Sequence, residues 1–198
     1  MGSYADDALF MSRNNIEYVE LISDDGKSKV MVIPAWQGRV MTTSAAGDEG
    51  DSYGWINYSF IKKRQIDLQF NPVGGEERFW LGPEGGVFSL YFRQGEKQIY
   101  KNWKVPPVLD IEAFKIQSQS KNCICLTKEG CLTNACGTTF YLNIKRTISL
   151  LDINEFAASF NLEFPKDIKA VAIRVITRLP ILEMNHGIKK QVDISLDA

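Results

Sequence analysis

Glu17–Ile22 (EYVELI) and Lys29–Ile33 (KVMVI) flank the turn Asp24-Asp25-Gly26 near the start of the chain, and this stretch indicates the fold class. Both flanking segments are short and rich in β-branched residues. Asp and Gly tolerate the positive φ angles that a tight hairpin turn requires. The pattern predicts an antiparallel hairpin, and we expect Arg39–Ser44 to add a strand to the same sheet.

The hydrophobic pattern of the rest of the chain also has mostly a period of two, in short segments separated by Gly, Pro, Asn and Asp. Helix is expected only at Tyr4–Arg13 and within Gly54–Lys63, where the pattern fits either a short helix or a loop. We therefore predict an all-β fold, an antiparallel β-sandwich with minor helix. The further predicted strands are Val87–Arg93, Ile111–Gln117, Lys121–Thr127, Thr138–Leu150, Glu155–Phe164, Lys169–Thr177 and a last one through Val192, Ile194 and Leu196.

Length and composition favour one ordinary globular domain over residues 1–198. The chain is 44% hydrophobic and 24% charged, with no repeat or composition shift that would mark a linker. Its 23 basic and 24 acidic side chains give a net charge of −1, so charge provides no reason to expect nucleic acid or an anionic membrane as a partner. No window approaches the roughly 20 apolar residues of a membrane helix, and no membrane span is predicted.

The four cysteines are Cys123, Cys125, Cys131 and Cys136. Their spacing lacks the paired Cys-x-x-Cys of a zinc site, so structural thiols are expected, with a disulfide to Cys131 or Cys136 as the alternative. The sequence also lacks the motifs of a zinc protease helix, a nucleophile elbow and a dinucleotide-binding turn. We therefore predict no metal and no cofactor.

The stretch Asn71–Gly86 (NPVGGEERFWLGPEGG) has the composition of a functional loop. Its glycines and prolines exclude a helix. The same backbone carries three carboxylates, an arginine and a tryptophan, which are Glu76, Glu77, Glu84, Arg78 and Trp80. Loops that carry such side chains on a rigid sheet commonly form binding or catalytic sites. A tight structural turn is the alternative.

Several motifs together resemble an uncharacterised family of Bacteroides-type bacteria, which in turn resembles galactose mutarotase and aldose 1-epimerase. The motifs are Pro34–Thr42 (PAWQGRVMT), Gly47–Gly50 (GDEG), Gly54–Asn57 (GWIN), the loop Gly74–Gly86, Trp103, Pro106-Pro107 and Asp110. The resemblance implies a β-supersandwich with a sugar-binding groove on a concave sheet. Mutarotase domains are longer than this chain, so it also implies the N-terminal portion of such a domain, without the half that supplies the glutamate base.

Under this resemblance, a sugar or oligosaccharide is the expected partner. Glu76, Glu77 and Glu84 could accept hydrogen bonds from sugar hydroxyls, with Arg78 holding one carboxylate; the alternative is an internal salt bridge. Trp80 could stack on a sugar ring or belong to the core.

Two further candidates lie outside this loop. Arg39 could point into the groove or outward from a strand. Ring opening requires an acid and a base, and His186, the single histidine, is the candidate catalytic residue or a surface histidine.

The leading hypothesis is a carbohydrate-interacting protein of the mutarotase or aldose-epimerase type, with acid/base ring opening in its complete form. One alternative is a non-catalytic carbohydrate-binding module. Another is an assembly domain that forms homo-oligomers through open sheet edges, because unpaired strand edges invite association. The resemblance favours the periplasm or cell envelope of a bacterium as the location, with the cytoplasm as the alternative.

Overall fold

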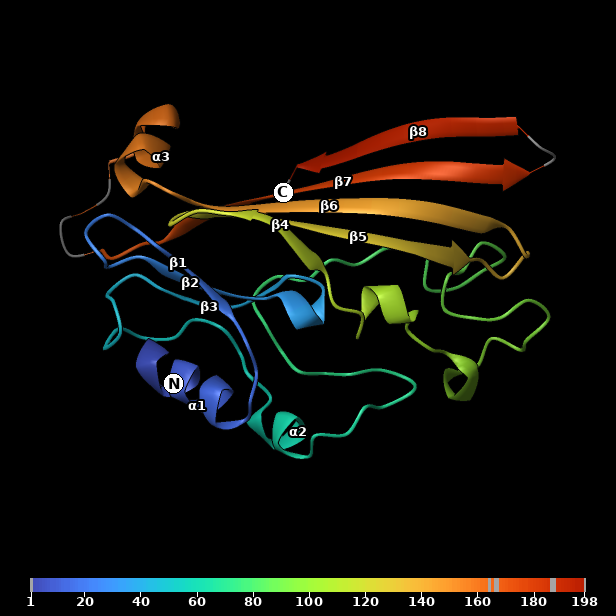
Figure 1. Cartoon of the computed structure of the whole chain (residues 1–198), viewed down its shortest axis with the longest axis horizontal. Helices are drawn as coiled ribbons and strands as arrows, with labels where there is room; N and C mark the ends of the chain where they lie inside the picture. Colours follow the sequence, from blue (N-terminus) through green and yellow to red (C-terminus); the bar gives the residue numbers. More distant parts are fainter. Residues whose placement is uncertain (1, 164, 166–167, 186–187, 198) are drawn as a thin grey trace.

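Two antiparallel sheets make up most of the regular secondary structure of the protein, which confirms the predicted all-β, sandwich-like fold (Figure 1). The computed structural model describes residues 2–163, 165, 168–185 and 188–197. The small sheet has the order β1-β2-β3 and the large sheet the order β4-β5-β6-β7-β8, so within each sheet consecutive strands pair. The strands are β1 (Val19–Ile22), β2 (Lys29–Ile33), β3 (Arg39–Ser44), β4 (Lys115–Gln119), β5 (Cys123–Thr133), β6 (Thr139–Leu151), β7 (Ala172–Asn185) and β8 (Ile188–Asp197).

The predicted N-terminal hairpin is present. Leu21 lies opposite Val30 in the β1–β2 ladder. In the turn, the Asp25 carboxylate accepts hydrogen bonds from the Ser23 hydroxyl (2.7 Å) and the Lys27 amide (3.0 Å), and Gly26 has a φ of 74°. The Asp side chain and the glycine thus close this turn locally.

The small sheet is covered on both faces, and this explains why β2 is buried along its whole length. Val30 and Val32 face the large sheet and belong to the main core. Met31 and Ile33 face the other way and pack with α1 (Tyr4–Arg13) and α2 (Tyr58–Lys62). The molecule therefore has three layers, with the two helices below the small sheet and the large sheet above it (Figure 1).

The large sheet turns one row of side chains towards the small sheet. In β6, alternate residues are buried, as period-two geometry requires. The buried apolar members of this inward row in β5, β6 and β7 are Ile124, Leu126, Leu132, Leu142, Ile144, Ile148, Leu150, Val175 and Leu179. Arg146 occupies one position of the same row and is 1% exposed.

Two predicted strands are wrong. Val87–Arg93 forms turns and bends, because the Ser89 hydroxyl donates to the Glu84 carbonyl (2.9 Å) and accepts from the Tyr91 amide (3.1 Å), which folds the segment back on itself. Val87 itself is exposed.

Glu155–Phe164 was the other incorrect strand, since its first part lies in helix α3 (Ile153–Ser159). Asp152 caps this helix by accepting hydrogen bonds from the Asn154 (2.8 Å) and Glu155 (3.0 Å) amides. A side-chain cap of this kind stabilises the first turn of a helix.

Other boundaries agree more closely. Helix α1 begins and ends at the predicted residues Tyr4 and Arg13. Strand β4 starts at Lys115 instead of Ile111, because the amides of Ile111 (2.9 Å) and Glu112 (3.0 Å) bond the Pro107 carbonyl after a short 3₁₀ turn, Pro107–Leu109. Two further 3₁₀ turns are Pro34–Trp36 and Tyr100–Asn102. Among the described residues, no helix has the length and apolar character needed to cross a membrane.

Gly74 offers a test of how closely the loop packs against the segment 55–57, which precedes α2. Its φ is 96°, and a Cβ there would lie 2.1 Å from the Trp55 carbonyl oxygen. Positive φ costs a residue with a Cβ about 1–2 kcal/mol, and displacing a packed backbone costs a similar amount. We expect Gly74→Ala to lower the free energy of unfolding by about 3 kcal/mol in urea titrations.

Gly85→Ala is the matched control, because a Cβ at Gly85 would meet nothing closer than 3.8 Å. The free energy of unfolding of this variant should stay within about 0.5 kcal/mol of that of the parent protein. Equal effects of the two substitutions would contradict the close approach at Gly74.

Candidate functional site

The loop Asn71–Gly86 runs along the free edge of β3 before it reaches the large sheet. The Glu76 amide donates to the Val40 carbonyl (2.9 Å), and the Val40 amide donates to the Glu77 carbonyl (3.2 Å). A Cβ at Gly75 would lie 2.8 Å from Cδ of Arg39, so glycine permits this contact. Glu77 thereby reaches Arg146 of the large sheet, while Glu76 lies against Thr43 of β3.

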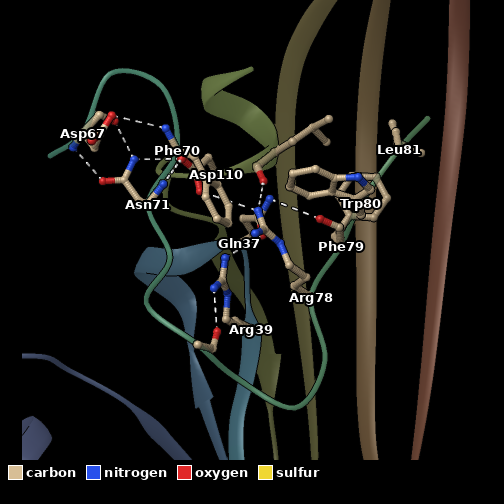
Figure 2. Close-up of polar contacts among 12 residues, drawn as sticks. Gln37, Arg39, Asp67, Phe70, Asn71, Arg78, Phe79, Trp80, Leu81 and Asp110 are labelled. Atoms are coloured by element: carbon tan, nitrogen blue, oxygen red, sulfur yellow. Dashed lines mark hydrogen bonds and ion pairs between the residues drawn. The ribbon is translucent and has the colours of Figure 1, made fainter. Parts of the chain in front are cut away.

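Arg39 is buried beneath this loop and is 1% exposed (Figure 2). Its Nη1 donates to the Gly74 carbonyl (2.7 Å), and its Nη2 lies 3.5 Å from Oε1 of Gln37. Burial, together with the positive charge of Arg78, lowers the pKa of Arg39 to about 10, so it remains a cation at neutral pH. The structure therefore places Arg39 against the loop backbone, and not in an open groove.

Arg78 joins the loop to the segment before β4 (Figure 2). Its Nη2 donates to the Leu109 carbonyl (2.7 Å) and lies 3.5 Å from Oδ1 of Asp110. Asp110 is 4% exposed, and its Oδ2 accepts from both the amide (3.0 Å) and the side chain (2.8 Å) of Asn71. Burial raises the pKa of Asp110, while the hydrogen bonds from Asn71 and the charge of Arg78 oppose this shift.

Glu77 pairs with Arg146, the arginine in the inward row of β6. Nη2 of Arg146 lies 2.5 Å from Oε2 of Glu77, and its Nη1 donates to the Thr177 hydroxyl (3.1 Å). Thr177 lies directly opposite Arg146 in the β6–β7 ladder. This ion pair thus links the loop to two strands of the large sheet.

These contacts form one charged cluster between the sheets, made of Arg39, Arg78, Arg146, Glu77 and Asp110. It holds three cations and two carboxylates, and Arg39 senses the charges of all four others. Among the described residues, Nε of each arginine is buried without a hydrogen-bond partner. The predicted site residues Arg39, Glu77 and Arg78 are therefore engaged inside the protein.

Glu76 lies apart from the charged cluster. The residue as a whole is exposed, but its carboxyl group lies against β3, where it accepts a hydrogen bond from the Thr43 hydroxyl (3.0 Å). Partial desolvation at this place raises the pKa of Glu76, against the effect of the hydrogen bond.

Trp80 and Glu84 meet at the far end of the loop. The Trp80 indole nitrogen donates to Oε1 of Glu84 (2.9 Å), and the guanidinium of Arg78 lies 4.2 Å from the Trp80 ring centroid. Trp80 is partly buried, whereas Glu84 is exposed. Trp80 is the aromatic residue among the predicted site residues, and together with Glu84 it forms the part of the loop that reaches the surface.

A ladder of aromatic rings leads from Trp80 to the surface. The Trp80 and Tyr91 centroids are 5.2 Å apart, and Tyr91 stacks on Trp103 at 5.5 Å with an interplanar angle of 7°. Trp103 in turn stacks on Tyr100 at 6.3 Å and 12°. Tyr91 is 2% exposed and donates to the Leu81 carbonyl (2.6 Å), while Tyr100 is 79% exposed.

An open pocket of about 470 Å³ lies over the outer end of this ladder. Gln98 fixes one wall, because its amide accepts from the Gly86 amide and donates to the Gly86 carbonyl, both at 2.8 Å. We call this pocket the aromatic surface. Its residues are Glu84, Gly85, Phe92, Gln98, Ile99, Tyr100 and Trp103.

Other predicted candidates do not contribute to this surface. His186 lies outside the described residues. All four cysteines are free thiols. In the part of the chain that the structure describes, no group of three His, Cys, Asp or Glu side chains is arranged to hold a metal ion.

The sequence model of a family described as "Family of unknown function (DUF6786)" matches residues 2–191. The chain belongs to this family. No curated protein matches the sequence, and no solved structure matches it either.

Sequence reasoning missed two parts of the site in this DUF6786 protein. Arg146 was not singled out, although strict alternation through Ile144 and Ile148 puts it on the buried face of β6. Tyr100 was also missed, because an exposed tyrosine does not stand out in a sequence. Only its stacking on Trp103, with the ladder of rings behind it, makes it part of a candidate site.

Asp110 offers a test of the charged cluster. Asp110→Asn would leave the half-buried Arg78 cation without its carboxylate. Removing one partner of a buried pair typically costs about 3 kcal/mol or more, and we expect a loss of about 3 kcal/mol in the free energy of unfolding.

Asp24→Asn is the matched control, since Asp24 also pairs with a basic residue, Lys121 (2.8 Å), but is fully exposed. Exposed pairs contribute little, so chemical denaturation should detect no change in this variant. An unchanged stability of Asp110→Asn would show that the Arg78–Asp110 contact does not hold the loop.

Proposed function

We propose that this DUF6786 protein binds a carbohydrate on the aromatic surface. The observation that supports this proposal best is the Tyr100–Trp103 stack at an open pocket, backed by the buried ring of Tyr91. Aromatic rings offer a large, rigid apolar face, and the C–H face of a pyranose is a suitable counterpart. Because the stack is already formed, little conformational entropy would be lost on binding.

Polar groups at the edge of the aromatic surface would give the site its specificity. Oε1 of Glu84 accepts from Trp80, which orients the carboxylate. Its other oxygen makes no hydrogen bond among the described residues, so it is available to a sugar hydroxyl. Apolar pockets with a few placed polar groups are the usual form of small-ligand sites.

We propose binding without turnover, which is the non-catalytic alternative raised by the sequence. Opening a sugar ring requires an acid and a base that act on the same molecule. Glu84 is the one carboxylate that lines the aromatic surface. Arg39, Glu77 and Arg78, which the mutarotase-like hypothesis assigned to the sugar, contact the protein interior instead.

The assembly hypothesis rests on a different feature. β4 and β8 form the two edges of the large sheet, and an unpaired edge can add a strand from another chain. Light scattering after size-exclusion chromatography would test it.

Calorimetric titration with a panel of hexoses and oligosaccharides tests the proposed site. We expect saturable heat with at least one saccharide and at least about tenfold weaker binding by Tyr100→Ala, because one stacking ring supplies on the order of 1–2 kcal/mol.

Tyr53→Ala is the control, since Tyr53 is 44% exposed and lies beside β3, away from the aromatic surface. If every saccharide gives no heat with a folded protein, the proposal is wrong. The same conclusion follows if both variants bind as well as the parent.

Polarimetry separates binding from catalysis. We expect the protein to leave the rate of anomer interconversion of a bound aldose unchanged, because the aromatic surface lacks a second carboxylate. Glu84→Gln should weaken binding without any effect on that rate. Acceleration by the parent protein and its loss in Glu84→Gln would instead establish an epimerase-type activity.

A further inference from the structure

The segment Arg93–Lys104, which carries the aromatic surface, is strongly basic. It contains four basic residues and one acidic residue in a chain whose net charge is −1. The basic residues are Arg93, Lys97, Lys101 and Lys104, all exposed. None of them forms an ion pair with a described residue. The one acid, Glu96, accepts from the Arg93 backbone amide (3.3 Å).

The backbone of this segment is fixed at several points. The Lys104 amide donates to the Tyr91 carbonyl (2.9 Å), and the Asn102 side chain donates to the Lys97 carbonyl (2.9 Å). The Gln69 side chain donates to the Tyr100 carbonyl (2.6 Å). The cations therefore project from a held scaffold, and they carry charges that the protein itself does not neutralise.

A second cavity, of about 500 Å³, adjoins the aromatic surface and shares Phe92 with it. Arg93, Lys104 and Glu96 line this second cavity, together with the hydrogen-bonding side chains of Gln94 and Asn102. The second cavity thus carries two cations and one carboxylate, Glu96, which accepts from the Arg93 amide, whereas Glu84 is the charged side chain of the aromatic surface.

We propose that the ligand is an acidic oligosaccharide, with one sugar ring on Tyr100 and Trp103 and a carboxylate or sulfate group between Arg93 and Lys104. This inference rests on the proposed carbohydrate binding. Arg and Lys bind such oxyanions through charge-assisted hydrogen bonds. Glu84, in the aromatic surface, repels the acidic group of the ligand, so the ligand binds in one orientation across the two cavities. A ligand that reaches both cavities must be longer than a single sugar.

Calorimetry with matched saccharides tests this inference on the full chain. The probes are a galacturonic acid tetramer and its methyl ester, which has the same rings without the charge, and a sulfated galactan oligomer with its unsulfated form. We expect at least one acidic probe to bind about tenfold tighter than its neutral counterpart, which corresponds to one charge-assisted contact. Comparison of the two pairs shows whether the acidic group is a carboxylate or a sulfate.

The salt dependence of binding and a set of charge-removing variants provide a second test. The preference for the acidic probe should fall as NaCl rises from about 50 to about 500 mM, because exposed charges are screened. Arg93→Gln and Lys104→Gln should each weaken binding of the acidic probe about tenfold and leave binding of the neutral probe unchanged. Lys63→Gln is the control, since Lys63 is exposed and lies at the end of α2.

The outcomes separate the two proposals. Equal binding of acidic and neutral probes, insensitive to salt and weakened by Tyr100→Ala, would overturn the acidic ligand and leave carbohydrate binding intact. An equal loss of affinity for the acidic probe in Lys63→Gln and in Lys104→Gln would also overturn the acidic-ligand proposal, since net charge alone would then explain the effect. Absence of heat with every probe would overturn both proposals.

Discussion

Arg146 of β6 reaches across the space between the two sheets to Glu77, and the Arg78–Asp110 pair and Arg39 lie beside it. A charge in this position is costly unless protein groups compensate for it. The compensating groups come from separate segments, namely the loop, the turn before β4, and β7 through Thr177. Because each cation needs its partner, the cluster forces these segments into one arrangement.

This requirement explains how a loop without regular secondary structure is held in place. Its first part pairs with the edge of β3 through backbone hydrogen bonds. Its middle part enters the charged cluster through Glu77 and Arg78. Its last part, with Trp80 and Glu84, is positioned at the base of the ring ladder. Some polar residues of the loop thus hold the interior together, and others reach the surface. This division is the reason that the proposed carbohydrate site is placed at Tyr100 and Trp103 and not at the arginines.

Prediction from sequence was most accurate where neighbouring residues decide the structure. The hairpin at Asp25-Gly26 and the helix Tyr4–Arg13 were both placed correctly, since a turn side chain and the cap at Ser3 act within a few residues. Prediction failed at Val87–Arg93 and at Glu155–Phe164. In both segments apolar residues suggest strands, but the hydrogen bond that Ser89 donates to Glu84 and the one that Asp152 accepts from Glu155 stabilise a different local structure.

The sequence by itself determined the all-β class, the positions of most strands along the chain and the concentration of charged side chains in one loop, because periodicity and turn chemistry depend on local geometry. Only the tertiary structure decided where those charges are used. Arg39, Glu77 and Arg78 have the same residue types as a sugar-binding groove would have, yet each meets its partner at a distant position in the chain: Gly74, Arg146 and Asp110. Similarly, Tyr100 belongs to a candidate site only because folding stacks it on Trp103 beside Glu84. Whether a polar group faces solvent or the interior depends on such long-range contacts, which local sequence patterns do not contain.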